Sequence, residues 1–451
     1  MSKLSYVGID LGSTTTKSVV IDDDLNILGR GITNSRSNYD LACQIARTEA
    51  LVDAQMSRLR STLADHRVLA DHVKILAPSV ERSFRYRQHI RLFDALDREC
   101  MAIAEGKPDL TAVLADLLAE MREETEKLFS GLSAMEKRKS EFFRDIAGAQ
   151  FQRLAEHRAN PKTMPYETIV GVFDRAIIKV ENEGDDLTFE GNALEALDRS
   201  LSQYKANDAV RAAAAEMLEG LLADPPHIGC SVGTGYGRAR LPFPKNQIRS
   251  EILCHGLGAH QMFPGTRTVL DIGGQDTKGI QVDDQGIVTS FQMNDRCAAG
   301  CGRYLGYIAD EMNLGVHELG PLALKATRHV RISSTCTVFA GAELRERLSL
   351  GEKREDILGG LHRAIILRAM SILARSGGVD EEFTFTGGVA HNPAAVRALR
   401  DLIGENYGKR TINISPDSIY MGALGAAIFA KRETDAGRAE RGVGSQSEAR
   451  A

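Results

Sequence analysis

Several features that define common protein classes are missing from this chain of 451 residues. Its formal net charge is -5, so it lacks the basic excess with which nucleic-acid-binding proteins meet phosphate backbones. No run of about 18 apolar residues suggests a membrane span. The first expected strand already starts at Tyr6, which leaves no room for a signal peptide ahead of it. The seven cysteines are an odd number, which argues against a closed disulfide framework. These absences favour a globular cytoplasmic protein that binds neither nucleic acid nor membrane.

The Gly-x4-Gly-Lys-Ser/Thr phosphate loop is also absent, but the first residues form another phosphate-binding pattern. Residues 6–22 alternate as a strand, a tight polar turn and a second strand. Asp10, at the end of the first strand, can hold hydrated Mg²⁺ through its waters. The turn can close on a polyphosphate through a flexible glycine, hydroxyl groups, backbone N–H groups and one positive charge, supplied by Gly12, Ser13, Thr14, Thr15 and Lys17.

The same pattern returns in residues 268–282, where Asp271 matches Asp10 and a second glycine turn follows. This turn contains Gly273, Gly274 and Gln275, and Gln275 has a suitable place to position an attacking water. A third glycine turn, Gly387-Gly388, follows another apolar strand and can pass close to adenine or ribose. Each turn alone could be an ordinary hairpin. Three in this order predict a nucleotide held between two α/β lobes, an order that resembles the actin-like ATPase superfamily.

Two cysteines lie at positions where helices are expected to start. Cys297 precedes an amphipathic stretch with Leu305, Ile308 and Met312 at helical spacing, and Asp295 is a plausible cap ahead of it. Cys336 precedes a second helical run. The positive end of a helix stabilises thiolates and anionic clusters, so each cysteine can supply half of an iron–sulfur site. Burial as small apolar residues is an equal alternative, and zinc is less attractive without a clustered partner.

Six segments of the chain resemble one family closely. They are the first hairpin, residues 271–278, 294–303, 333–340 and 386–392, and the closing stretch 421–430. These segments are similar to the ATPase components of 2-hydroxyacyl-CoA dehydratase activators and benzoyl-CoA reductases. The resemblance covers roughly residues 5–37 and 229–430.

This resemblance implies a specific function. In the family, one 4Fe–4S cluster is bridged between two ATPase protomers, each of which gives two cysteines, and these positions match Cys297 and Cys336. ATP binding and hydrolysis change the angle between the helices that carry the cluster. A low-potential electron then passes to a catalytic iron–sulfur partner that holds the acyl-CoA, and ferredoxin is the expected donor. Cys301, one helical turn after Cys297, is either a spare ligand or, as we favour, a packing residue.

The length of the chain separates the members of this family. An extra block from about residue 38 to about residue 226 reads as mostly helical, with apolar stripes such as Val52, Met56, Leu59 and Leu63. The block resembles the larger ATPase subunit of benzoyl-CoA reductase, and small homodimeric activators lack it. We therefore expect a benzoyl-CoA reductase type of ATPase subunit with a distinct second ATPase subunit. The alternatives are a dehydratase activator or, in another class, an actin-like kinase or chaperone without a cluster.

The expected organisation is a two-lobed actin-like ATPase with a large helical insertion. The predicted parts are lobe I in 1–37 and 227–267, the insertion in 38–226, lobe II in 268–432, and a polar, disordered tail in 433–451. Within 227–267, Glu251 and His255 lie four residues apart on a stretch that reads as a helix. They could form a metal pair, but a local polar contact is favoured.

Overall fold

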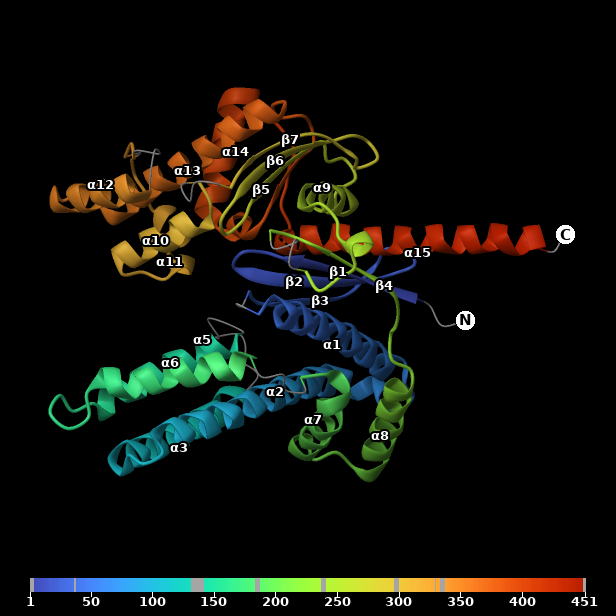
Figure 1. The fold of residues 1–451 in the computed structure, drawn as a ribbon, viewed down its shortest axis with the longest axis vertical. Coiled ribbons are helices and arrows are strands. Elements are labelled where there is room, and N and C mark those ends of the chain that lie inside the picture. The colour runs from blue at the N-terminus through green and yellow to red at the C-terminus, as the bar shows by residue number, and fades with distance from the viewer. Residues whose placement is uncertain are drawn as a thin grey trace. The chain divides into compact units, whose positions relative to one another are not determined.

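The computed structural model describes residues 4–35, 38–130, 142–182, 187–236, 241–295, 300–328, 330–332 and 337–448. The chain divides into two compact units (Figure 1). Unit 1 consists of Met1–Ser35 and His227–Ala451, and unit 2 is Arg36–Pro226. Unit 1 carries both sheets, and unit 2 is built from helices.

The first sheet has the strand order β3-β2-β1-β4. Its strands are β1 (Leu4–Leu11), β2 (Thr15–Asp22), β3 (Ile27–Asn34) and β4 (His227–Thr234). Strands β1 and β2 form an antiparallel hairpin in which Asp10 lies opposite Lys17, and β4 runs parallel to β1. The expected strand–turn–strand unit is therefore the centre of the first lobe.

The second sheet repeats this arrangement with the order β7-β6-β5-β8-β9. Its strands are β5 (Thr268–Ile272), β6 (Thr277–Val282), β7 (Val288–Asn294), β8 (Phe383–Thr386) and β9 (Ile412–Asn413). Asp271 lies opposite Lys278 in the antiparallel pair β5–β6, and β8 runs parallel to β5. Each lobe therefore presents one hairpin turn beside the end of one parallel strand.

Two helices pack closely between the sheets, as Figure 1 shows. Helix α15 (Met421–Glu448) lies on β1, and helix α9 (Glu251–Met262) contacts both α15 and the second sheet. Glycines permit this approach: a Cβ on Gly8 would overlap the α15 backbone, and a Cβ on Gly425 would overlap the carbonyl of Cys254. The small residues of the closing stretch thus allow backbones to touch.

This packing corrects the lobe boundaries expected from the sequence. Helix α9 belongs to the segment assigned to lobe I but contributes Ile252 and Ala259 to a core with the second sheet. Residues 421–432, assigned to lobe II, pack on the first sheet instead. Helix α15 runs from Met421 to Glu448, and Lys431 pairs with Asp435 along it at 2.6 Å. A contact between distant segments, which local patterns do not encode, sets these boundaries.

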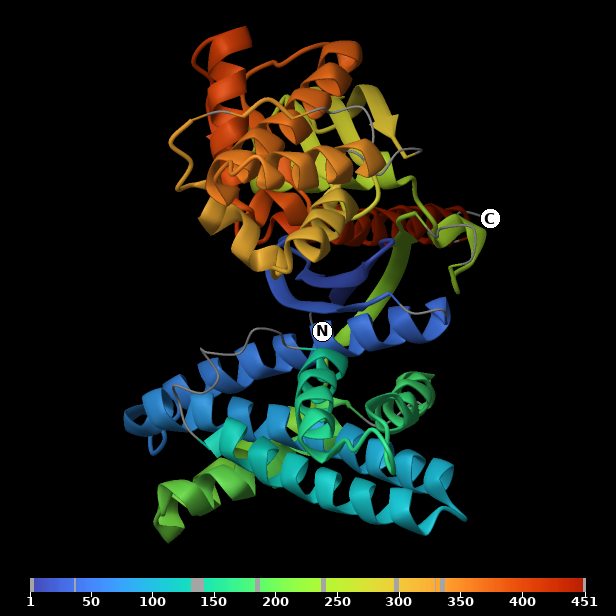
Figure 2. The same cartoon turned by 90° about the vertical axis from the view of Figure 1, so that its left-hand side faces the viewer.

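Further helices cover the second sheet (Figure 2). They are α10 (Gly302–Met312), α11 (Val316–Ala323), α12 (Thr337–Ser349), α13 (Arg354–Ser376) and α14 (Pro393–Tyr407). Among the described helices, α13 is long and apolar enough to cross a bilayer by length and composition, but 67% of its apolar window is buried inside the fold, as in the core helix of a globular protein. Four short 3-10 helices complete the described elements: η1 (Ala70–His72), η3 (Lys245–Gln247), η4 (Gly388–His391) and η5 (Ser418–Tyr420).

Unit 2 consists of helices with apolar stripes that meet in two cores. The helices are α1 (Tyr39–Asp65), α2 (Val73–Ala104), α3 (Pro108–Ser130), α5 (Phe143–Arg158), α6 (Tyr166–Asn182), α7 (Phe189–Tyr204) and α8 (Asp208–Ala223). The predicted stripe residues Val52, Met56, Leu59 and Leu63 are buried. The α1 and α8 helices start at asparagine caps, Asn38 and Asn207, whose side chains accept from backbone N–H groups.

Candidate functional site

The turns of the two hairpins face each other in unit 1. A Cβ added to Gly274 would overlap Thr14 Oγ1 and would lie 3.4 Å from Ser13 Oγ. A glycine at this position therefore lets the second turn approach the hydroxyl groups of the first. The structure brings the predicted residues of both turns together at one place between the lobes.

The backbone carbonyl groups of the first turn accept hydrogen bonds from Ser35 and Lys17. Ser35 donates its hydroxyl to Gly12 O at 2.6 Å and its N–H to Thr14 O at 2.8 Å. Lys17 Nζ donates to Thr15 O at 3.0 Å, so the ammonium group lies over the turn. Thr14 is exposed, and Gly12, Ser13, Thr15 and Lys17 are half-buried. The turn thus offers hydroxyl groups and one cation to a ligand.

Asp10 is enclosed by backbone and by glycine. A Cβ on Gly235, which has a φ of +111°, would lie 2.7 Å from Asp10 Oδ1, and a Cβ on Gly422 would lie 2.6 Å from Oδ2. Asp10 is only 4% exposed, and burial raises the pKa of its carboxyl. Oδ1 is buried and accepts no hydrogen bond from the described residues. An oxygen with these properties fits a hydrated divalent cation, which would satisfy it.

Asp271 occupies the matching place in the second hairpin but has three partners. Lys278 Nζ lies 3.1 Å from Oδ2, Thr386 Oγ1 donates to Oδ1 at 2.9 Å, and His255 Nδ1 lies 3.4 Å from Oδ1. Burial alone would raise the pKa of Asp271, but His255 and Lys278 hold it well below its ordinary value. Asp271 is therefore an ionised group with its interactions already made.

Lys278 is buried among carboxylates at 1% exposure. Besides Asp271, its ammonium group lies 2.8 Å from Glu251 Oε1 and 2.9 Å from Asp276 Oδ2. Burial lowers the pKa of Lys278, but the three carboxylates outweigh it and raise that pKa well above its ordinary value. Burial raises the pKa of Asp276. Lys278 thus ties the second hairpin to helix α9.

His255 lies between the two aspartates, with Nε2 3.7 Å from Asp10 Oδ2 and Nδ1 3.4 Å from Asp271 Oδ1. Burial lowers its pKa, but Asp271 and then Asp10 outweigh this effect and raise it to about 9. His255 is also 4.0 Å from Glu251. In the part of the chain that the structure describes, no three His, Cys, Asp or Glu side chains are grouped as a metal site. The contact between Glu251 and His255 agrees with the local polar contact favoured from the sequence.

The third glycine turn reaches the same place from β8. Gly387 has a φ of +84°, and a Cβ there would overlap Ile272 O and lie 3.0 Å from Asp271 Oδ1. A Cβ on Gly388 would meet no atom within 4 Å, so this residue borders open space. Gln275 is half-buried, and its side chain makes no hydrogen bond to the described residues. These placements leave Gln275 and Gly388 accessible to a ligand.

The predicted cluster ligands, Cys297 and Cys336, lie outside the described residues. Helix α12 begins at Thr337, directly after Cys336, but α10 begins at Gly302 rather than beside Cys297. Gly300, two residues before the start of α10, has a φ of +106°, which lies outside the helical region. Cys301 is fully buried, in agreement with a packing role, and Leu305, Ile308 and Met312 are buried on α10.

Sequence reasoning missed the part played by Lys278, Asp276 and Thr386. A signal for Lys278 was present, because both hairpins place a lysine seven residues after the aspartate, as Asp10–Lys17 and Asp271–Lys278. Antiparallel pairing across a turn of this length puts each lysine opposite its aspartate. The contacts of Lys278 with Glu251 depend on α9, which only the folded structure brings close.

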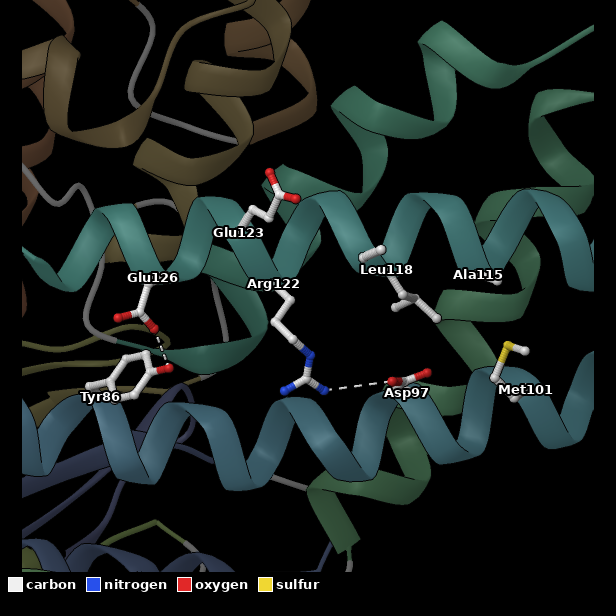
Figure 3. Close-up of a pocket in the computed structure, with 9 residues that line it drawn as sticks. Tyr86, Asp97, Met101, Ala115, Leu118, Arg122, Glu123 and Glu126 are labelled. Carbon is white, nitrogen blue, oxygen red and sulfur yellow. Dashed lines mark hydrogen bonds and ion pairs between the residues drawn. The ribbon is translucent and has the colours of Figure 1, made fainter. Parts of the chain in front are cut away.

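Unit 2 contains a groove of about 590 Å³ between α2 and α3, shown in Figure 3. Arg122 pairs there with Asp94 at 2.7 Å and Asp97 at 3.6 Å, and the hydroxyl of Tyr86 donates to Glu126. These interactions hold helices together across the groove. None of its described lining residues is a glycine, so it lacks the turns that bind phosphate.

The two matching lobes, with a hairpin turn from each and a third turn from β8, define a two-lobed actin-like ATPase fold with a large helical insertion, as predicted. The chain belongs to the BadF/BadG/BcrA/BcrD ATPase family, which matches residues 7–430. Component A of (R)-2-hydroxyglutaryl-CoA dehydratase from Acidaminococcus fermentans shares the fold. That structure has a TM-score of 0.51 at 23% identity, covering 96% of this chain and 99% of its own.

Relatives in sequence match about half of this chain. The (R)-2-hydroxyglutaryl-CoA dehydratase activating ATPase of Acidaminococcus fermentans is 41% identical over 218 residues, which are 48% of this chain and 81% of the relative. The activator of lactoyl-CoA dehydratase from Anaerotignum propionicum is 42% identical over 45% of this chain and 76% of its own. One of the subunits of the benzoyl-CoA reductase of Thauera aromatica is 33% identical over 39% of this chain and 62% of its own.

Proposed function

We propose that this chain hydrolyses ATP to drive low-potential electrons into an iron–sulfur enzyme that acts on an acyl-CoA. The observation that carries the proposal is the meeting of two Asp-glycine turns around a buried set of charges. Asp10, Glu251, Asp271 and Asp276 supply four carboxyl groups, and Lys278 and His255 supply two cationic groups. This acidic excess suits the Mg²⁺ that accompanies ATP.

Each turn has its own task in this proposal. The hydroxyl groups of Ser13, Thr14 and Thr15 and the ammonium group of Lys17 bind phosphate oxygens. Gly273 and Gly274 bring the second turn against the first, and Gly387 and Gly388 form the side next to adenine or ribose. The exposure and the contacts given above support these assignments.

Hydrolysis needs a metal ion and a positioned water. Asp10, whose Oδ1 lacks a hydrogen-bond partner among the described residues, would hold Mg²⁺ through its waters, and the ion would neutralise charge that develops on the phosphate oxygens. Asp271 is fixed by Lys278, Thr386 and His255, so it orients the second turn. Gln275 then aligns the attacking water with its side-chain amide.

Cys297 and Cys336 are the proposed ligands of half a 4Fe–4S cluster shared with a second ATPase subunit. Their support is the family of the chain and the helix that starts directly after Cys336. Cluster chemistry would supply one-electron transfer at low potential. A differential affinity of ATP for two arrangements of the lobes is what can couple hydrolysis to that transfer.

Two partners fit this function. Benzoyl-CoA reductase, with ferredoxin as donor, is favoured by the helical unit 2 between Arg36 and Pro226, because such a block resembles that of the larger ATPase subunit of this enzyme. A 2-hydroxyacyl-CoA dehydratase is favoured by the higher identity to its activators, 41% against 33%. Both place the chain in the cytoplasm with catalytic iron–sulfur subunits.

Anaerobic co-purification followed by an ATPase assay tests the function and separates these partners. Recovery of a distinct smaller ATPase and two catalytic subunits supports the reductase. A homodimer that activates a dehydratase on its own supports the activator. ATP hydrolysis that depends on a sugar, without iron in any fraction, would instead indicate an actin-like kinase.

A further inference from the structure

The start of helix α10 is bound directly by the second glycine turn. Gly302 donates its N–H to Gly273 O at 2.8 Å, and Arg303 donates its N–H to Gly274 O at 2.7 Å. The N-cap residue, Cys301, makes no side-chain cap hydrogen bond. The first N–H groups of a helix have no acceptor within the helix, so they must find one elsewhere. Here the turn between β5 and β6 supplies two of those acceptors.

The N–H groups of the same two peptide units point away from helix α10. In a trans peptide the C=O and N–H groups point in opposite directions, and the peptides of this turn are trans. The N–H groups of Gly274 and Gln275 therefore point away from α10. Neither donates to an acceptor among the described residues. A Cβ on Gly274 would overlap the Thr14 hydroxyl, so these two peptide units border the place where the turns meet.

A third contact ties the segment before α10 to the same hairpin. Thr277 Oγ1, at the first residue of β6, donates to Gly300 O at 2.8 Å, and both residues are buried. The turn, the start of β6 and residues 300–303 are thus one hydrogen-bonded group.

We propose that the Gly273–Gly274 and Gly274–Gln275 peptide units link the nucleotide phosphate to helix α10. Their N–H groups bind the terminal phosphate, while their carbonyls hold the N–H groups of Gly302 and Arg303. This inference rests on the proposed function, because it requires ATP between the hairpins. Hydrogen bonds on the two sides of one peptide polarise each other, so a bound phosphate strengthens the bonds to α10. Loss of that phosphate weakens them and loosens the start of the helix.

A pair of substitutions at one position isolates the backbone contact. Arg303→Pro removes the N–H that Gly274 O accepts, and Arg303→Ala removes the same side chain but keeps the N–H. Proline is tolerated in the first turn of a helix, where the N–H has no partner within the helix. Arg303 is exposed, so neither change opens a cavity in the core.

Hydrogen–deuterium exchange of the full chain without its cluster gives the readout. Peptides covering residues 300–312 are compared in Mg²⁺ with ADP and with the non-hydrolysable analogue ADPNP, alongside the Kd of each nucleotide. We expect wild type and Arg303→Ala to exchange several-fold more slowly with ADPNP. Arg303→Pro should bind both nucleotides within about threefold of wild type but lose most of this difference.

The outcomes separate the link from the function on which it rests. An Arg303→Pro protein that keeps the full difference overturns the link, as does an Arg303→Ala protein that loses as much. Wild type that binds ADPNP without any change in residues 300–312 also overturns it, while nucleotide binding stands. Wild type that binds no nucleotide overturns both proposals.

Thr277 provides an independent pair if Arg303→Pro does not fold. Thr277→Val removes the hydroxyl that binds Gly300 O, and Thr277→Ser keeps it. We expect Thr277→Val to reduce the nucleotide-dependent difference in residues 300–312 and Thr277→Ser to restore it. Equal behaviour of the two variants would show that the hydroxyl has no part in the link.

Discussion

The two hairpins share one design but are completed in different ways. In both, an aspartate at the end of one strand lies opposite a lysine at the start of the next. Lys17 is half-buried and binds only a turn carbonyl within the described residues, whereas Lys278 is buried among three carboxylates. In the second hairpin the aspartate–lysine pair stabilises the fold, whereas in the first it would serve the proposed ligand. The first hairpin is therefore the one whose charged groups still have places for a nucleotide to bind.

Replacing each of the two lysines should have the largest effects and should show most clearly how the two hairpins differ. Lys278→Met leaves buried carboxylates without a counter-ion and should lower the free energy of unfolding by about 3–5 kcal/mol. Lys17→Met should change it by less than about 1 kcal/mol but should weaken nucleotide binding roughly tenfold. Urea denaturation and calorimetric nucleotide titration measure the two effects. Equal losses of stability would show that the hairpins do not differ as described.

The histidine between the hairpins should make stability depend on pH. Its pKa is raised from an ordinary 6.5 to about 9, so its stabilising effect is complete below 6.5 and is lost as the pH rises through 9. Without nucleotide or Mg²⁺, His255→Gln should be less stable than wild type by about 3 kcal/mol at pH 6.

That difference should shrink toward zero by about pH 10, as followed by urea denaturation of both proteins across this range. A difference that is constant or grows with pH would mean that His255 is neutral in the folded chain.

The two aspartates should separate hydrolysis from stability. Asp10→Asn should lower the rate of ATP hydrolysis on the order of 100-fold, because Mg²⁺ loses its anionic partner. Its free energy of unfolding should stay near that of wild type, since burial already disfavours the ionised form of Asp10. Asp271→Asn should lower both quantities, because Lys278 and His255 lose an ionised partner. Stability that falls equally in both variants would contradict the distinction.

The smallest expected effect concerns the hydroxyl that binds Asp271. Thr386→Val removes the 2.9 Å hydrogen bond to Oδ1 and should lower the free energy of unfolding by about 1 kcal/mol. Thr386→Ser keeps the hydroxyl and serves as the matched control. If the two variants are equally stable, this hydrogen bond does not help to complete the second hairpin.

Local patterns in the sequence were enough to predict the two-lobed fold and its helical insertion. Glycine turns between alternating strands identified the hairpins, and apolar stripes such as Val52 and Leu59 identified buried helix faces. Helix α10 begins at Gly302 rather than beside Asp295, and Gly300, just ahead of this start, has a positive φ. A glycine alone does not reveal which sign of φ it adopts.

Contacts between distant segments could not be predicted in the same way. Helices α9 and α15 pack against each other through close backbone approach at Gly258 and Gly425. The small size of these glycines permits the contact, but the sequence does not indicate which segment each glycine will contact. The carboxylates around Lys278 come from α9 and from the second hairpin, and only folding combines them. The cluster ligands Cys297 and Cys336 stay a prediction, as does the role of Gln275.

Iron and acid-labile sulfide analysis of anaerobically purified protein, together with its ATPase activity, tests the central claim most directly. We expect about four iron atoms and four sulfides per pair of ATPase subunits. Cys297→Ala and Cys336→Ala should each remove them while leaving nucleotide binding largely intact. A colourless, iron-free wild-type preparation that hydrolyses ATP and retains its natural partners would contradict the account.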